Sequence, residues 1–214
     1  SAASDVYKRQ LFGSARENMS LFLNQGNGKF ERKVLVQKHS AFGYVGFRWI
    51  DFDGDGDLDV FTINGDNVDS DPYNTLKPYH GIRLYLNEGG LSFVERYFYP
   101  MYGAYGLEVQ DFDLDGDLDL AAIAFNPDFN AKQSESFVYL DNLGKNRFAA
   151  KTFASPRTDR WMTMGSGDID GDGDKDIILG GGYVPAGLTI DNQLLMKEMG
   201  EKGRPLLILR NKVK

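Results

Sequence analysis

The sequence contains no cysteine among its 214 residues, which excludes a disulfide framework and a zinc–thiolate site. Long apolar runs are also missing, because the longest, residues 120–125, falls far short of the roughly 20 residues that a membrane-spanning helix needs. Positive charge is scarce: 24 Lys and Arg against 31 Asp and Glu give a formal net charge of −7. This balance disfavours a phosphate-binding surface, so no nucleic-acid partner is expected. The two histidines, His39 and His80, have no motif around them, and no catalytic constellation is visible.

The residues that are present can build a sizeable core. Hydrophobic residues make up 42% of the chain and aromatic residues 13%, which argues against disorder. Most of the acidic residues are Asp, with 23 Asp and only 8 Glu. Asp is a poor helix and strand former, but it suits turns and supplies oxygen ligands for metals.

Fifteen of the 23 Asp residues stand in three nine-residue windows, which start 60 and 57 residues apart. A near-constant period is the mark of a repeat architecture. The windows supply these candidate ligands: Asp51, Asp53, Asp55, Asp57 and Asp59; Asp111, Asp113, Asp115, Asp117 and Asp119; Asp168, Asp170, Asp172, Asp174 and Asp176.

Each window is flanked by short strand-like runs. One precedes it, one follows it directly, and a third further on ends in Asn; in the first two units a Gly-containing hairpin follows that Asn. One unit therefore reads as four short antiparallel strands in about 55–60 residues, which is typical of a β-propeller blade. The predicted fold is all-β: part of a propeller ring, with about three to four blades and Asp-rich calcium loops.

The predicted organisation starts with a leader. Residues 1–10 are set apart because residues 5–10 resemble the in-frame translation of a transposon end used in sequencing-library adapters; an ordinary flexible N-terminus is the alternative. The remaining predicted units are a half blade over 11–37, a blade over 38–98 with loop 51–59, a blade over 99–154 with loop 111–119, and a blade over 155–214 with loop 168–176 that lacks its fourth strand. We expect upstream blades and a signal peptide to belong to a longer parent bacterial protein.

The spacing within each window predicts a Ca²⁺ site. Side chains at positions 1, 3, 5 and 9 converge, the backbone carbonyl of position 7 adds an oxygen, and Gly at position 6 permits the sharp turn. Carboxylates without His, Cys or Met favour Ca²⁺ over zinc or copper. An EF-hand fits badly, because it needs Glu at position 12, where Thr62, Ala122 and Leu179 stand. The alternative is a metal-free acidic turn, which carries the repulsion of five carboxylates.

These loops, together with Phe42-Gly43 and a Leu-x-Leu-x-Asn strand, resemble the FG-GAP/VCBS repeats of integrin α-chains and many secreted bacterial proteins. The resemblance covers residues 18–212 and departs from the usual loop at Leu114, where Gly is common. It implies a calcium-binding propeller with three sites here, located outside the cell, in the periplasm or on the cell surface, with a binding role.

Long connections should lie on the face opposite the Asp loops, over residues 64–81, 126–135 and 180–205. The first mixes aromatic and polar groups that suit a sugar or polar peptide; its candidate ligand-binding residues are Tyr73, Asn74, Lys77, Tyr79 and His80. The alternative is a loop packed on its neighbouring blade. Residues 192–199 favour one or two helical turns, with Leu194, Leu195 and Met199 packed on the blade.

A polar cluster at 157–161 (Arg157, Asp159, Arg160, Trp161) predicts an inter-blade salt bridge. The functional prediction is a non-enzymatic, calcium-stabilised module for binding or adhesion, with a protein or carbohydrate ligand. The alternative is the C-terminal part of a secreted propeller enzyme such as a polysaccharide lyase.

Overall fold

The computed structural model describes residues 18–39, 42–65, 75–131, 134–153, 158–183 and 193–213. The leader predicted at residues 1–10 lies outside this part of the chain. The strands are β1 (Asn18–Asn24), β2 (Phe30–Gln37), β3 (Tyr44–Ile50), β4 (Asp59–Asn64), β5 (Gly81–Asn87), β6 (Phe93–Pro100), β7 (Ala104–Gln110), β8 (Asp119–Ala124), β9 (Phe137–Asn142), β10 (Phe148–Lys151), β11 (Trp161–Gly167), β12 (Asp176–Gly181) and β13 (Leu206–Leu209), and the one helix of the described residues is α1 (Gln193–Lys202).

The strands form separate antiparallel sheets in which each strand pairs with its neighbours in sequence. β1 and β2 pair alone, β3–β6 and β7–β10 form two four-stranded sheets, and β11–β13 form a three-stranded sheet. The prediction of a β-rich chain built from repeated antiparallel sheets is confirmed. The finer division into blades at the predicted boundaries stays a prediction.

The inner strands of the four-stranded sheets are the most buried. β4, β5 and β8 are buried at every residue, and β8 is a continuous apolar run after its first Asp. The fourth strand, β6, is instead exposed or half-buried along its length. A strand covered on both faces favours apolar residues, and the polar exceptions Asn64 and Arg83 are hydrogen-bonded to each other.

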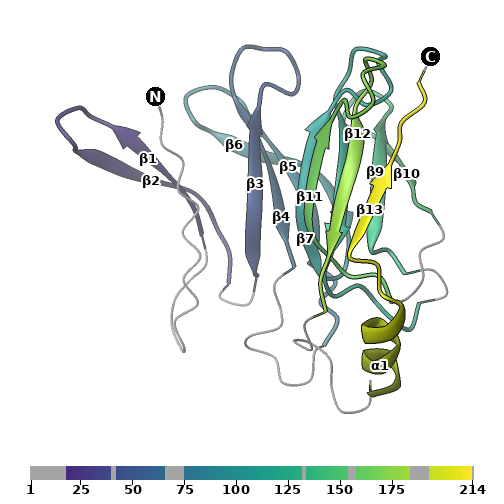
Figure 1. Cartoon of the computed structure of the whole chain (residues 1–214). Helices are drawn as coiled ribbons and strands as arrows, with labels where there is room; N and C mark the ends of the chain where they lie inside the picture. The colour runs from purple at the N-terminus through teal and green to yellow at the C-terminus, as the bar shows by residue number, and fades with distance from the viewer. Residues whose placement is uncertain are drawn as a thin grey trace.

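The sheets pack face to face. One core cluster joins the sheets β3–β6 and β7–β10 through residues such as Phe61 and Leu120, and another joins β7–β10 to β11–β13 through Ile123 and Trp161. The first strands contact one another, β3 with β7 and β7 with β11; all three are labelled in the middle part of Figure 1. The Arg48 guanidinium links two of them by donating to Glu108 Oε1 at 2.9 Å.

The two ends of the sheets differ. The Asp-rich loops join β3 to β4, β7 to β8 and β11 to β12, whereas α1 lies at the opposite end, beyond β12 and β13 (Figure 1). The predicted helix is present and extends to Lys202. Leu195 and Met199 are buried as predicted, but Leu194 is 79% exposed, so its predicted packing was wrong. Leu194 and Leu195 are adjacent on a helix, and a 100° turn per residue takes one of them to solvent.

Within the described residues, no helix has the length and hydrophobicity needed to cross a membrane.

Candidate metal centre

The first Asp of each window folds its loop. Asp51 accepts hydrogen bonds from the backbone N–H groups of Gly54 at 2.9 Å and Gly56 at 3.1 Å. Asp168 makes the same two bonds, to Gly171 at 2.7 Å and Gly173 at 3.0 Å. The loop can turn back on this carboxylate because position 6 is glycine. Its backbone adopts a positive φ, for example 93° at Gly56, which is unfavourable for residues with a side chain.

The middle loop makes the same turn but has leucine in place of glycine at position 4. Asp111 accepts from the N–H of Gly116 at 3.1 Å, and Gly116 has a φ of 97°. At position 4, however, Leu114 holds a φ of 61° where the other loops have glycine. The departure seen in the sequence therefore falls on a left-handed backbone position, where a side chain is strained.

The last Asp of each window ties the loop to the third strand of its sheet. Asp59, Asp119 and Asp176 are at most 1% exposed. In each case one carboxylate oxygen accepts from the backbone N–H at loop position 2, and the other accepts at 2.8 Å from the N–H of the Asn that follows the third strand's apolar run. These partners are Asn87, Asn142 and Asn211.

The three loops gather carboxylate oxygens that can hold a metal ion. Within the described chain, groups whose oxygens lie within 4.8 Å of one another are formed by Asp51, Asp53 and Asp59; by Asp111, Asp113 and Asp115; by Asp113, Asp119 and Asp141; and by Asp168, Asp170 and Asp176. Asp55 and Asp172, predicted as ligands at position 5, lie outside these groups, as do the side chains of Asp57, Asp117 and Asp174. Position 7 was expected to contribute its backbone carbonyl.

Asp141 is the acidic neighbour that sequence reasoning missed. It lies in β9, and Lys151 Nζ donates to its Oδ2 at 2.8 Å. The corresponding residue before the third-strand Asn is Leu86 in one sheet and Arg210 in another. An Asp at that point of the repeat was the available signal.

The donor set fits a divalent metal ion. Three loop oxygens, Asp111 Oδ1, Asp117 Oδ1 and Asp174 Oδ1, are buried and accept no hydrogen bond within the described residues. Burial, followed by repulsion from Asp115 and Asp119, raises the pKa of Asp117 to about 6. Burial and the nearby Asp59 likewise raise the pKa of Asp53. A bound cation relieves both the burial cost and the repulsion, so these carboxylates are suited to one.

Three of the predicted ligand-binding residues, Lys77, Tyr79 and His80, are described, and they precede β5 at the end of the sheets opposite the Asp loops. Tyr73 and Asn74 lie outside the described residues. Lys77 and Tyr79 are half-buried, and His80 is 1% exposed. The Tyr79 ring meets the His39 ring edge-on at 4.8 Å and the His80 ring at 5.2 Å. These ring contacts lie within residues 38–98, a single predicted blade, so packing of this loop on a neighbouring blade stays a prediction.

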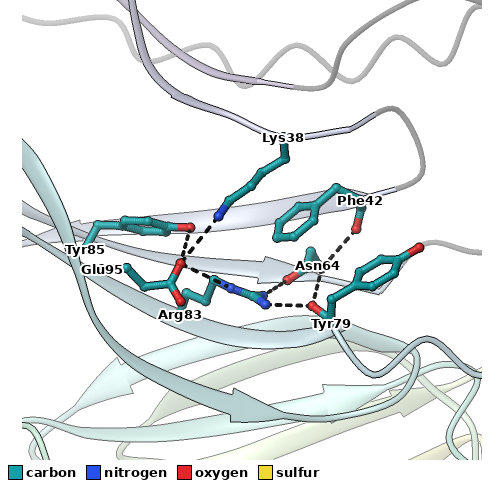
Figure 2. Close-up of polar contacts among 7 residues, drawn as sticks. All are labelled: Lys38, Phe42, Asn64, Tyr79, Arg83, Tyr85 and Glu95. Atoms are coloured by element: carbon teal, nitrogen blue, oxygen red, sulfur yellow. Dashed lines mark hydrogen bonds and ion pairs between the residues drawn. The ribbon is translucent and has the colours of Figure 1, made fainter.

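A buried arginine organises this end of the sheet, as Figure 2 shows. Arg83 is 5% exposed and donates to Asn64 Oδ1 at 2.6 Å and to the carbonyl of Tyr79 at 2.9 Å. Its guanidinium lies 4.8 Å from the ring centre of Phe42 and 3.9 Å from that of Phe98.

Glu95 supplies the negative charge of this network. Arg83 Nε lies 3.5 Å and Lys38 Nζ 3.6 Å from Glu95 Oε2, and Tyr85 donates to the same oxygen at 3.0 Å (Figure 2). Burial lowers the pKa of Arg83, whereas Glu95 acts in the opposite direction. The network fixes the Phe42-Gly43 segment against β5.

The polar cluster before β11 was predicted to form an inter-blade salt bridge, and its contacts differ from that prediction. Asp159 is 1% exposed and pairs with Arg204, which precedes β13 in the same sheet. Arg160 is the residue that crosses to the preceding sheet: it donates to the carbonyl of Phe125 at 2.8 Å and to Asn126 Oδ1. The link between sheets at these residues is therefore a hydrogen-bonded arginine, and the ion pair lies within one sheet. Arg157 lies outside the described residues.

Comparison with known proteins supports one part of this picture directly. Residues 8–62 match the family model of the FG-GAP-like repeat. The match includes Phe42-Gly43 and the whole of the first Asp loop, and it confirms the predicted resemblance to FG-GAP repeats over that segment. No curated protein matches the chain.

Proposed function

We propose, from the FG-GAP-like repeat and the three carboxylate-rich loops, that this chain is a calcium-stabilised β-propeller module that acts as a binding or adhesion scaffold. The observation that carries the proposal is the same construction at three loops in phase. Each loop combines clustered carboxylates with a buried Asp that is bonded to the third strand of its sheet. Such a loop transmits the stability of a bound ion directly to the sheet.

Calcium is the cation that this donor set suits. The clusters contain carboxylate oxygens and no nitrogen or sulfur ligand, and Ca²⁺ takes six to eight such oxygens in a flexible geometry. Mg²⁺ retains its water shell and rarely fills a site made by protein alone. When bound, Ca²⁺ would supply positive charge that neutralises the buried loop oxygens and fixes the loop.

The sheets have the arrangement expected of propeller blades. They follow one another along the chain, they pack face to face, and their first strands contact each other. We propose that they form part of a ring around a central axis. FG-GAP repeats of this kind favour a location outside the cell, in the periplasm or on the cell surface.

The proposed ligand surface lies at the end that carries α1, opposite the Asp loops. Lys77 and Tyr79 are half-buried, so part of each side chain can reach a ligand. His80 is buried and cannot. A protein or carbohydrate ligand fits this mixture of ring and polar groups. The proposal gives this module a binding role and no catalytic one.

Calorimetric titration of the metal-stripped chain with Ca²⁺ tests the proposal. Three bound ions per chain are expected, with much weaker heat from Mg²⁺. Asp53→Asn, Asp113→Asn and Asp170→Asn should each lower the stoichiometry by one ion. Asp128→Asn is the matched control, because Asp128 lies outside the loops and its Oδ1 accepts from the N–H of Asn130. The absence of a Ca²⁺ isotherm, or an unchanged stoichiometry in all three variants, would contradict the assignment.

A further inference from the structure

The chain contains two Asn-Gly pairs, Asn27-Gly28 and Asn64-Gly65. In such a pair the backbone nitrogen of the glycine can attack the side-chain amide carbon of the asparagine, because glycine has no Cβ to hinder the approach. A C–N bond forms, ammonia leaves, and water then opens the cyclic imide to aspartate or isoaspartate. Since the two pairs have the same sequence, the structure around each pair decides which one reacts.

Asn27 lies at the tip of the hairpin that joins β1 to β2, and its side chain is exposed. The turn is closed by the N–H of Lys29, which donates to the carbonyl of Gly26 at 3.0 Å. Asn27 and Gly28 have φ values of 51° and 71°. Asn and Gly are the residues that tolerate this left-handed conformation best, so the turn itself favours the reactive pair.

The same turn closes the hairpins of the two four-stranded sheets. There the N–H groups of Ser92 and Arg147 donate to the carbonyls three residues before them, at 3.2 and 3.3 Å. The counterparts of Asn27 are therefore Gly90 and Lys145, and both are exposed. The exposure of Asn27 is thus a property that this hairpin shares with those of the four-stranded sheets.

Asn64, in contrast, is held inside the molecule at the end of β4, where it is 0% exposed. Its Nδ2 donates to the carbonyls of Phe42 at 2.9 Å and Tyr79 at 3.1 Å, and its Oδ1 accepts from Arg83 at 2.6 Å (Figure 2). The attacking nitrogen is engaged as well, because the N–H of Gly65 donates to a backbone carbonyl at 2.9 Å.

The two pairs therefore differ in the opening that the reaction requires. The asparagine side chain must swing over its own backbone, so each pair has to leave its hydrogen-bonded geometry first. At the tip of the β1–β2 hairpin, fraying of one turn is sufficient. At Asn64 the buried strands β4 and β5 must separate from their surroundings, which costs a much larger part of the global free energy of unfolding.

We propose that Asn27 is a modification site, at which the folded chain forms an imide with Gly28, loses ammonia and gains one negative charge, while the fold protects Asn64. Water is the co-reactant that completes the step. The isoaspartate product carries an additional backbone carbon in the turn, so the hairpin cannot keep its present geometry. The change is irreversible, and it increases the negative charge of a chain whose formal charge is already −7.

Peptide mapping of the full chain by mass spectrometry tests the proposal. The folded protein is incubated with Ca²⁺ at mildly alkaline pH, and loss of the amide is followed at both asparagines. We expect Asn27 to react at least tenfold faster than Asn64, and its products to include isoaspartate. Similar rates at the two sites, or faster loss at Asn64, overturn the proposal. Aspartate as the sole product would indicate direct hydrolysis and overturn it too.

The same measurement in urea that unfolds the chain gives the reference. Both pairs should then react at similar rates, because neither is held by structure. An Asn64 that stays unreactive in the unfolded chain would show that the fold is not what protects it. An Asn27 that reacts only after unfolding would show that the turn blocks the attack. Either result overturns the proposal.

Gly28→Asn tests the nucleophile without removing the turn. Asn146 occupies the equivalent place in the β9–β10 hairpin with a φ of 56°, so the turn accepts asparagine there. The added side chain hinders the attacking nitrogen and should slow the loss of the amide at Asn27 at least tenfold. Asn27→Lys, which copies Lys145, should abolish the charge change at this hairpin. An unchanged rate in Gly28→Asn overturns the proposal.

Discussion

The carboxylate of Asp176 accepts a 2.8 Å hydrogen bond from the backbone N–H of Asn211, 35 residues further along the chain. The other oxygen of Asp176 accepts from the N–H of Ile169 inside the Asp loop. One buried side chain therefore joins the loop to the third strand of its sheet. Because the bond recurs from Asp59 to Asn87 and from Asp119 to Asn142, it is a property of the repeat.

Replacing Asp176 by Asn should destabilise the chain even without metal. The amide keeps one acceptor oxygen but turns an NH₂ group toward a backbone donor, and a buried donor left unsatisfied costs about 1–3 kcal/mol. Urea unfolding of the metal-stripped protein measures the loss. Asp128→Asn, which lies outside the three Asp-rich loops, should change the free energy of unfolding far less. Equal effects would show that the bond to Asn211 contributes nothing specific.

Leu114→Gly should stabilise the middle loop. Leu114 is 53% exposed and holds a φ of 61°, so glycine relieves backbone strain while little apolar burial is lost. The net gain should be about 0.5–1 kcal/mol, because glycine also raises the entropy of the unfolded chain. Leu58→Gly is the matched control: Leu58 is 54% exposed and is not among the residues of positive φ, so it should lose stability. If both variants lost the same amount of stability, backbone strain at Leu114 would be refuted.

The metal-stripped protein should become less stable as the pH rises from 5 to 7. The pKa of Asp117 is raised to about 6 in the folded chain, and those of Asp53, Asp113 and Asp174 are also raised, first by burial and then by neighbouring carboxylates. A raised carboxyl pKa stabilises the folded state when the group is protonated, and that contribution disappears as the pH passes the folded pKa. Thermal melts across this range check the sign, and Asp117→Asn should flatten the slope. A midpoint that climbs with pH would contradict the burial of these carboxylates.

Arg83→Lys should be costly although it preserves the charge. Arg83 is buried and donates in two directions, to Asn64 Oδ1 and to the Tyr79 carbonyl, which an ammonium group cannot reproduce in the same geometry. Losing hydrogen bonds to a charged group costs about 2 kcal/mol. Arg96→Lys, at a pair with Glu88 whose side chains are both exposed, should change stability by less than about 0.5 kcal/mol. Denaturant unfolding of the two variants provides the comparison.

Much of the fold was predictable because its signals are local and repeated. The Asp windows fixed the positions of the β3–β4, β7–β8 and β11–β12 loops, and the apolar runs after them became β4, β8 and β12. The exposure of Leu194 could not be inferred, since both Leu194 and Leu195 fit an apolar face until the orientation of α1 is known.

The sequence predicted which Asp residues of a loop come together, but not the contacts that residues distant in the sequence make with them. Spacing indicated that Asp51, Asp53 and Asp59 converge, which they do. Spacing within a window could not show that Asp141, over 20 residues further on, joins the middle loop. Nor could it show that Arg160 reaches Asn126, because that contact depends on how two sheets pack.

The proposed function requires that calcium bound in the Asp loops stabilises the sheets. Thermal unfolding of the metal-stripped chain with Ca²⁺, with Mg²⁺ and with neither ion tests it most directly. At about 100 times the dissociation constant, each occupied site adds about 2.7 kcal/mol. We therefore predict a midpoint that rises by many degrees with Ca²⁺ and changes little with Mg²⁺. Identical midpoints in all three conditions would show that calcium does not stabilise the folded chain.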